Sequence, residues 1–220
     1  MHRGRRPAVV LFTLCVLTIL TACGSGSAKI RLINADPSTS NLDLLIDGKP
    51  LASSVAYGSA SGYASVSSGS RHLQVEASGT SNVFSDQTIS LSSATDNSAL
   101  FTGSGAMILN DNNSAPSSGN VSLRVINAAP SLGTADVYVV AAGTNLATFS
   151  PTFSSVTFPS ASAYTTLAAG SYQIIFTPPG QKFGRITSSS LVFSSGQVRT
   201  IVGLNGQTGG FTVAVLSDLN

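Results

Sequence analysis

The chain contains no tryptophan, only two cysteines and two histidines, and charged residues at only 9% of its 220 positions. Nucleic-acid binding depends on clustered Lys and Arg, so this composition excludes nucleic acid as a partner. With so few histidines and acids, groups for general acid–base catalysis are scarce. Tryptophan, the aromatic residue that most often stacks on a sugar ring, is missing as well.

The N-terminal segment has the pattern of an export signal. Arg3, Arg5 and Arg6 precede an almost wholly apolar run from Ala8 to Leu20. A basic start, an apolar stretch of about 7–15 residues and small residues before a cut are the marks of a secretory signal peptide. A transmembrane anchor needs about 20 apolar residues, which is more than this run supplies. We therefore expect residues 1–22 to be a cleaved signal peptide.

The tetrapeptide from Leu20 to Cys23 resembles the lipobox of bacterial lipoproteins. In that family the cysteine thiol takes a diacylglycerol, the chain is cut just before it, and further acyl chains such as palmitate follow. The resemblance implies lipidation of Cys23 and an extracytoplasmic, membrane-anchored protein, because about two lipid signals give stable anchoring. Gly24 follows the cysteine, which favours the outer membrane if the host is Gram-negative.

Removal of the signal peptide changes the net charge and the cysteine content of the mature chain. Three of the 11 Lys and Arg residues precede the cut, which leaves eight against nine Asp and Glu and a formal net charge of −1. Cys15 is removed and Cys23 is acylated, so no disulfide is expected even where the compartment permits one. The mature protein must be stabilised by buried cores.

The chain repeats itself. Ile30–Ser38 matches Leu123–Ser131 at an offset of 93, and Tyr63 matches Tyr164 at an offset of 101, so the second copy has about eight extra residues. Solenoid repeats are only about 20–50 residues long, so this is a domain duplication. We expect a tether at 23–28, a first domain at 29–109, a polar linker at 110–120 and a second domain at 121–220.

Both copies show short runs rich in Val, Ile, Thr, Tyr and Phe, bounded by Gly, Pro, Asn and Ser. Leu73–Ala77 alternates apolar and polar residues, which indicates a half-buried strand. No segment of the mature chain has a sustained helical period. The pattern predicts an all-β protein of two tandem immunoglobulin-like antiparallel β-sandwich domains.

Two segments of the first copy resemble a bacterial domain-of-unknown-function family, numbered 4397. They are Arg31–Ser38, a strand ending in Asn-Ala and a proline turn, and Leu42–Gly48, a strand with Asp at its second position and a final Asp-Gly. The second copy fits the same family pattern as far as Val139 and departs from it at Val140-Ala141, where the first copy has Asp47-Gly48. The resemblance implies an extracytoplasmic β domain, often in tandem, and no known activity.

His72 is the single histidine of the mature chain, and its matched position holds Gln173, which cannot act as a base. No serine lies in a Gly-x-Ser-x-Gly elbow. The Asp111-Asn112-Asn113 run lacks the Gly and the distal Glu of an EF-hand loop. We therefore expect His72 to be a solvent-facing strand residue, and we expect no catalytic residue, no metal and no cofactor.

A few polar and proline residues persist in both copies. Asp43 matches Asp136, whereas Asp36 and Asp47 become Ala129 and Val140. We expect the Asp43 and Asp136 carboxylates to be structural and to accept hydrogen bonds from the backbone of the Asn-Ala-x-Pro turn. Arg31 and Arg124 could pair with these carboxylates or lie over the sheet, and a ligand role is not favoured. The other repeat-matched structural residues are Pro37 and Pro130.

The insertion of the second copy carries Phe149, Phe153 and Phe158. Apolar residues on a long loop indicate a contact site, but they could equally cap the end of the sandwich. The sequence favours a lipid-anchored, non-enzymatic envelope module that presents a β surface to an envelope protein or a glycan. The alternatives are an envelope hydrolase with a site between the domains and a periplasmic assembly factor.

Overall fold

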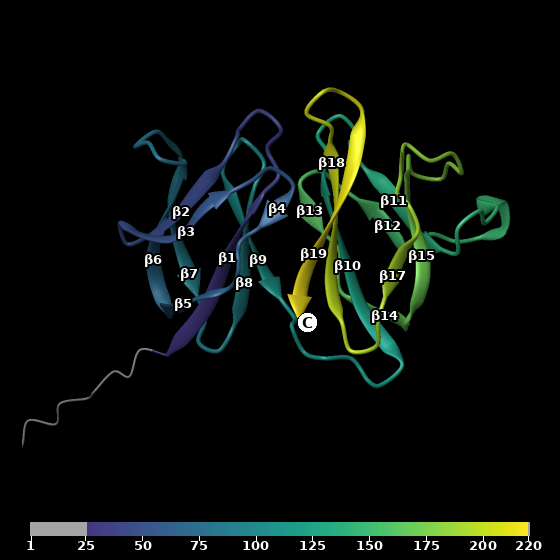
Figure 1. Ribbon diagram of the computed structural model, residues 1–220, viewed down its shortest axis with the longest axis horizontal. Coiled ribbons are helices and arrows are strands. Elements are labelled where there is room, and N and C mark those ends of the chain that lie inside the picture. The colour runs from purple at the N-terminus through teal and green to yellow at the C-terminus, as the bar shows by residue number, and fades with distance from the viewer. Residues whose placement is uncertain (1–25, 220) are drawn as a thin grey trace, which may run out of the picture.

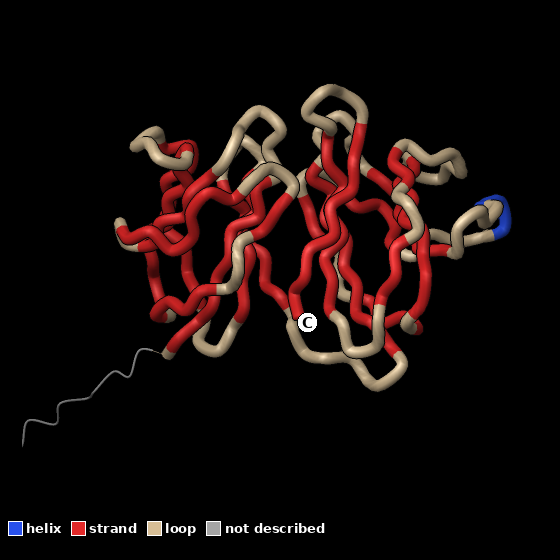
Figure 2. The backbone as a smooth tube through the Cα atoms, viewed as in Figure 1, coloured by secondary structure: helices blue, strands red, loops and turns tan. Residues whose placement is uncertain are grey.

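The computed structural model describes residues 26–219, which form two β-sandwiches side by side (Figure 1). The predicted signal peptide and Cys23 lie outside the described residues. Strands dominate the described chain, and the helical turn η1 (Leu146–Thr148) lies at its far edge (Figure 2). Among residues 26–219, no helix has the length and apolar character needed to cross a bilayer. The predicted all-β sandwich architecture is confirmed.

The first domain is built from two facing sheets. One sheet has the order β4-β1-β8-β9 with β5 also on β1, and the other has the order β3-β2-β6-β7. The strands are β1 (Ser27–Asn34), β2 (Leu42–Ile46), β3 (Lys49–Val55), β4 (Ser59–Ala60), β5 (Ala64–Ser67), β6 (Gly69–Ala77), β7 (Val83–Leu91), β8 (Asp96–Phe101) and β9 (Ala106–Asp111).

The second domain repeats this plan. Its sheets have the orders β13-β10-β18-β19, with β14 on β10, and β12-β11-β15-β16, with β17 on β15. The strands are β10 (Asn120–Ala128), β11 (Ala135–Val140), β12 (Phe153–Val156), β13 (Ser160–Ala161), β14 (Thr165–Ala168), β15 (Gly170–Thr177), β16 (Ile186–Thr187), β17 (Leu191–Phe193), β18 (Val198–Asn205) and β19 (Phe211–Leu219).

One strand pair in each domain departs from the expected antiparallel arrangement. β1 runs parallel to β8, and β10 runs parallel to β18. Parallel strands are usually covered on both faces and are therefore apolar along their whole length. β10 fits this rule, since every residue after its first is buried. The central strands are thus buried twice, once in their own domain and once against the other domain.

The side chains of β1 alternate between two buried environments, the core of the first domain and the interface between the domains. Ile30 and Leu32 pack in the core of the first domain, whereas Ile33 packs in a separate cluster shared by both domains. In β10, Leu123 and Val125 enter the second core, and residues of β10 join the same shared cluster. The buried members of this shared cluster are Ile33, Ala35, Leu100, Ile126, Ala128, Val202, Leu204 and Leu216.

Two predicted boundaries need correction. The linker is shorter than 110–120, because Asn110 and Asp111 pair with Asn97 and Asp96 and extend β9 to Asp111. The connecting segment therefore runs from 112 to 119. The predicted tether is also shorter than 23–28, because β1 begins at Ser27, which pairs with Ser67 of β5.

Candidate functional site

The two domains meet through the sheets that contain β1 and β10, and an arginine from each sheet lies in the interface. Arg31 of β1 and Arg124 of β10 are only 1% and 2% exposed. Each occupies a strand position that faces away from its own core and toward the other domain. A buried guanidinium is costly unless it is paired and hydrogen-bonded, so the partners of these residues define the interface.

Arg31 is paired across the interface. Its Nη2 donates to Oδ1 of Asp218 at 2.5 Å and its Nη1 donates to the carbonyl of Ser217 at 3.0 Å, both in β19. Within its own domain, Nε donates to Oγ of Ser98 at 2.8 Å. The guanidinium also lies 4.6 Å from the ring centre of Tyr63, a cation–π distance. Burial lowers the pKa of Arg31, but Asp218, Tyr63 and Asp111 together raise it by more, so the net pKa is raised.

Arg124 makes the reciprocal set of contacts. Its Nη2 lies 2.6 Å from Oδ1 of Asp111 in β9 of the first domain. Its Nε donates to Oγ1 of Thr200 at 2.8 Å within its own domain. The guanidinium lies 4.8 Å from the ring centre of Tyr164. Each domain therefore sends one arginine to an aspartate of the other domain.

The two aspartates are anchored by matched hydroxyl groups. Asp111 Oδ2 accepts from Tyr63 and Ser98 at 2.6 Å each. In the second domain, Asp218 Oδ2 accepts from Tyr164 at 2.9 Å and from Thr200 at 2.5 Å. We call these eight residues the reciprocal clamp: Arg31, Tyr63, Ser98, Asp111, Arg124, Tyr164, Thr200 and Asp218.

The clamp corrects one interpretation of the sequence. Arg31 and Arg124 do not pair with Asp43 and Asp136. Each pairs with an aspartate in the last strand of the opposite domain, and Nε of Arg31 also lies 3.9 Å from Oδ2 of Asp111 in its own domain. The pairing of Tyr63 with Tyr164 was visible in the sequence. Asp111 was assigned to the linker, so its match with Asp218 was missed. Aligning the last strand of each copy would have shown two acids at matched positions.

Asp43 and Asp136 accept hydrogen bonds from backbone amides, as predicted, but these amides lie outside the Asn-Ala-x-Pro turn. Asp43 Oδ1 accepts from the amide of Ser54 at 2.7 Å, and Asp136 Oδ1 accepts from the amide of Ser155 at 2.8 Å. Both serines have left-handed φ angles, 57° and 52°, beside register shifts in the neighbouring strand pairs. Such a conformation costs about 1–2 kcal/mol for a residue with a side chain. The matched aspartates therefore hold two β-bulges and do not contact the Asn-Ala-x-Pro turn.

The pKa of Asp43 reflects these contacts. Burial raises its pKa, but hydrogen bonds from the Ser54 amide, the Ser78 hydroxyl and the Gly79 amide lower it further than burial raises it. In the second domain, the amide of Gly180 donates to Oδ2 of Asp136 at 2.9 Å. The carboxylate thus joins the bulge to the following hairpin turn in both domains.

The Asn-Ala-x-Pro turn is held by its own asparagine, a role that sequence analysis did not assign. Asn34 Oδ1 accepts from the amide of Asp36, and Asn127 Oδ1 accepts from the amide of Ala129, both at 3.3 Å. Both asparagines are fully buried, and each donates to two backbone carbonyls. Asn side chains favour turns because they can bond the backbone two residues onward.

Pro37 and Pro130 occupy the second position of the turns that follow. In these turns the amide of Thr39 donates to Asp36 O at 3.2 Å, and the amide of Leu132 donates to Ala129 O at 3.0 Å. Proline fixes the φ angle that this turn position requires. Both prolines therefore lie where the matched turns need them.

His72 lies on an exposed face of β6. Its Nε2 is 2.5 Å from Oδ1 of Asp86 on β7, and this hydrogen bond lowers the pKa of Asp86. Both side chains are about half exposed. Among residues 26–219, no three His, Cys, Asp or Glu side chains are grouped as metal ligands.

The three phenylalanines of the insertion differ in how far they are buried. Phe153 is buried in the core of the second domain, and Phe158 is half-buried. Phe149 is 47% exposed, and its carbonyl accepts from Nζ of Lys182. Next to that lysine, Phe183 is 54% exposed. A single loop surface made of all three residues does not form; Phe149 instead shares the outer edge of the second domain with Phe183.

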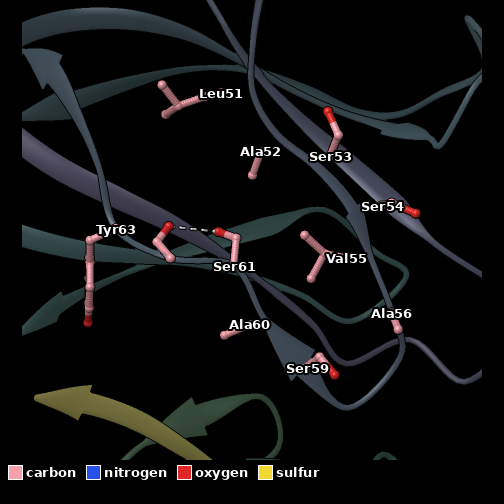
Figure 3. A pocket seen from close by; sticks show the side chains of 11 residues that line it. Leu51, Ala52, Ser53, Ser54, Val55, Ala56, Ser59, Ala60, Ser61 and Tyr63 are labelled. Carbon is pink, nitrogen blue, oxygen red and sulfur yellow. Dashed lines mark hydrogen bonds between the residues drawn. The ribbon is translucent and has the colours of Figure 1, made fainter. Parts of the chain in front are cut away.

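A hollow of about 530 Å³ lies in the first domain where the edge strands β3 and β4 diverge. Figure 3 shows it lined by small alanine and serine side chains, with Ser61 Oγ bonded to the carbonyl of Gly62 at 3.0 Å. Tyr63 is its only aromatic lining residue, and its hydroxyl is engaged by Asp111 of the clamp. The hollow contains no charged side chain.

The family described as "Domain of unknown function (DUF4397)" matches residues 28–138, half of the chain. The chain belongs to this family. The match covers the first domain and runs into β11 of the second domain. That the second domain is itself a second DUF4397 copy stays a prediction. Its sheet order supports it, since it repeats that of the first domain except that two short strands, β16 and β17, stand in the place of β7.

Solved structures offer only weak likenesses. A family 26 carbohydrate-binding module from Eubacterium rectale, solved with maltoheptaose, is 13% identical with a TM-score of 0.27, over 86% of this chain and 95% of that one. The TIE protein of Bacillus anthracis is 12% identical, with a TM-score of 0.27 over 87% and 34%. A leucine-rich repeat protein of Bacteroides thetaiotaomicron is 13% identical, with a TM-score of 0.22 over 80% and 25%. None of the curated proteins matches the chain.

Proposed function

We propose that this DUF4397 protein is an exported lipoprotein, acylated at Cys23, that acts without catalysis as an envelope interaction module for a protein or glycan. The observation that carries the proposal is the position of β1. This strand begins at Ser27, so four residue steps separate it from Cys23, a reach of at most about 14 Å. Acylation of Cys23 would therefore hold the start of β1 close to the lipid surface.

Anchoring at Cys23 would orient the first domain with the end opposite to the start of β1 facing away from the membrane. β1 starts at the lower end of the first domain in Figure 1, and its other end leads into the turns at the upper end. Eight strand residues span about 26 Å. The turns that connect β1 to β2 and β8 to β9 would face away from the membrane, where envelope partners can reach them.

The reciprocal clamp supports a role as one rigid body. Four buried charges and their hydroxyl partners bridge the domains, beside a shared apolar cluster. Misplacing one domain would leave a buried charge without its partner, which is costly. The alternative of a hydrolase site between the domains is not favoured at the clamp, since its acids and arginines are buried against one another.

Intact mass spectrometry of the protein from the membrane fraction tests the anchor. The proposal expects a chain that begins at Cys23 and carries diacylglycerol or three acyl chains, and it expects this species to be lost in Cys23→Ala. Cys15→Ala is the matched control and should leave the mass of the mature species unchanged. An unlipidated mature chain in the wild type would contradict the proposal.

Capture of partners separates the remaining alternatives. Crosslinking of intact cells, followed by purification of the lipidated chain, should recover envelope protein or glycan if the chain is an interaction module. Stoichiometric recovery of one larger complex during its biogenesis would instead favour the assembly factor. Turnover of a glycosidic or ester substrate by the purified chain would favour the hydrolase.

A further inference from the structure

A second hollow, of about 410 Å³, lies at the end of the first domain where β1 ends. The β1–β2 turn forms one wall, and Phe84 of β7 and the loop after β8 form the other. We propose that this hollow binds a pyranose ring of a neutral saccharide. The inference deepens the proposed function and rests on it only for the direction in which the hollow faces.

The polar side of the hollow is a fixed carboxylate. Asp36 is largely buried, and its Oδ1 accepts from the amide and the hydroxyl of Ser38 at 3.0 and 2.8 Å. Its Oδ2 lies 3.0 Å from the same hydroxyl. A carboxylate offers about four acceptor sites, so acceptor capacity remains for the hydroxyl donors of a ligand. Thr39, Ser40 and Asn41 add neutral polar groups to the same wall.

The apolar side of the hollow is an aromatic ring. Phe84 is 40% exposed, and its ring lies 6.0 Å from that of Phe101, tilted by 34°. Phe101 is fully buried and supports the exposed ring from behind. A pyranose has both an apolar C–H face and a rim of hydroxyls, so it can cover Phe84 while it donates to Asp36.

Gly103 keeps the carboxylate close to the loop. A Cβ at this position would lie 3.2 Å from Cγ of Asp36, and its φ angle is +94°. A side chain there would be strained and would press on Asp36. The loop after β8 therefore approaches the Asp36 carboxylate more closely than a residue with a side chain would allow.

The second domain lacks this combination. Strand register places Ala129 at the position of Asp36, Arg185 at that of Phe84 and Gly203 at that of Phe101. The space next to Gly203 is filled, because a Cβ there would lie 2.8 Å from the ring of Phe176. The site is therefore specific to the first domain, and the second domain supplies natural replacement residues.

The chemistry favours a neutral saccharide over other ligands. No Lys or Arg lines the hollow, so an anion has no counter-charge there. A quaternary ammonium ligand usually requires several aromatic rings arranged as a cage, whereas only Phe84 is exposed among the aromatic lining residues. Carboxylate and hydroxyl acceptors beside one ring suit a sugar.

Isothermal titration calorimetry on the detergent-solubilised full chain tests the site with maltohexaose, cellohexaose and chitohexaose. At least one should bind, and Asp36→Asn and Phe84→Arg should each weaken its affinity about tenfold or more, since a single buried polar or aromatic contact is worth that much. Phe84→Arg copies the second domain's residue. Phe183→Ala, an exposed aromatic in the second domain, should leave the affinity unchanged. Thermal unfolding of each variant checks that the fold is retained.

Failure of all three saccharides to bind would overturn the inference, as would binding that Phe84→Arg leaves intact. Binding of tetramethylammonium that depends on Phe84, without saccharide binding, would replace the sugar by a cation. A lipidated chain that binds no saccharide would refute the sugar site alone. Saccharide binding by a chain that is not acylated at Cys23 would refute the anchor and leave the site standing.

Discussion

Arg31 and Asp218 are 187 positions apart in the chain, yet Nη2 of the first donates to Oδ1 of the second at 2.5 Å in the buried interface. Arg124 and Asp111 form the corresponding ion pair with the domains exchanged, with Nη2 2.6 Å from Oδ1. Replacing a buried ion pair by apolar residues is often neutral, whereas removing one partner is costly. The clamp therefore fixes how the domains are oriented more than it adds to their stability.

We expect Asp218→Asn to lower the free energy of unfolding by about 3–5 kcal/mol, because the buried Arg31 would lose its closest carboxylate and keep only Asp111, 3.9 Å from its Nε. Asp111→Asn should cost a similar amount, because the two contacts are reciprocal. Chemical denaturation measures both. The control is Asp47→Asn, which breaks the exposed pair with Arg71 and should have a much smaller effect. A loss no larger than that control would contradict the role of the clamp.

The two tyrosines of the clamp, Tyr63 and Tyr164, should ionise at a higher pH than an exposed tyrosine. Burial raises the pKa of Tyr63 and of Tyr164, with Asp111 and Asp218 adding to it against the opposing effect of the arginines. Burial, with Asp36 nearby, also raises the pKa of Tyr57, to about 12. A raised pKa in the folded state gives stability that is complete below the unfolded value of about 10 and is lost as the pH rises above it.

Absorbance at 295 nm during an alkaline titration measures this effect. We expect these three tyrosines to ionise together with unfolding, above the pH at which exposed tyrosines titrate. Tyr164→Phe should remove one late-ionising group. If all five tyrosines titrated near pH 10 while circular dichroism still showed folded protein, the buried hydroxyl network would be wrong.

Asp136→Asn should lower the free energy of unfolding by about 1–3 kcal/mol, because it weakens two part-buried hydrogen bonds from backbone amides to the buried carboxylate. Asp43→Asn should act in the same direction with a smaller effect, since Asp43 is more exposed. The lowered pKa of Asp43 implies that its contribution is present above about pH 4 and is lost as the pH falls. Thermal unfolding at pH 7 measures both variants. Unchanged stability would refute the structural role of this pair.

Phe153→Ala should cost about 3–5 kcal/mol, as truncation of a buried phenylalanine does, because Phe153 packs in the second core. Phe149→Ala, four residues earlier and exposed, should leave the unfolding temperature almost unchanged. Thermal unfolding of the two variants compares them directly. Equal losses would contradict the division of the insertion into a core residue and a surface residue.

The sequence by itself determined the all-β class, most of the long strands and the family, because side-chain alternation and the turn residues that bound each strand are local properties of the chain. Leu73–Ala77 shows this: it alternates as predicted, with Leu73 and Val75 buried in the core. The proline turns were found for the same reason.

Only the tertiary structure decided the partners of the matched polar residues. Arg31 sits one position from Ile30 and Leu32, and alternation shows that it faces away from them but not what lies opposite. Its partners come from β19, near the end of the chain. The parallel pairing of β1 with β8 and the union of Phe84, Phe101 and Asp36 in one hollow are likewise contacts between distant segments. Such contacts depend on how sheets pack against one another, and local periodicity carries no information about that packing.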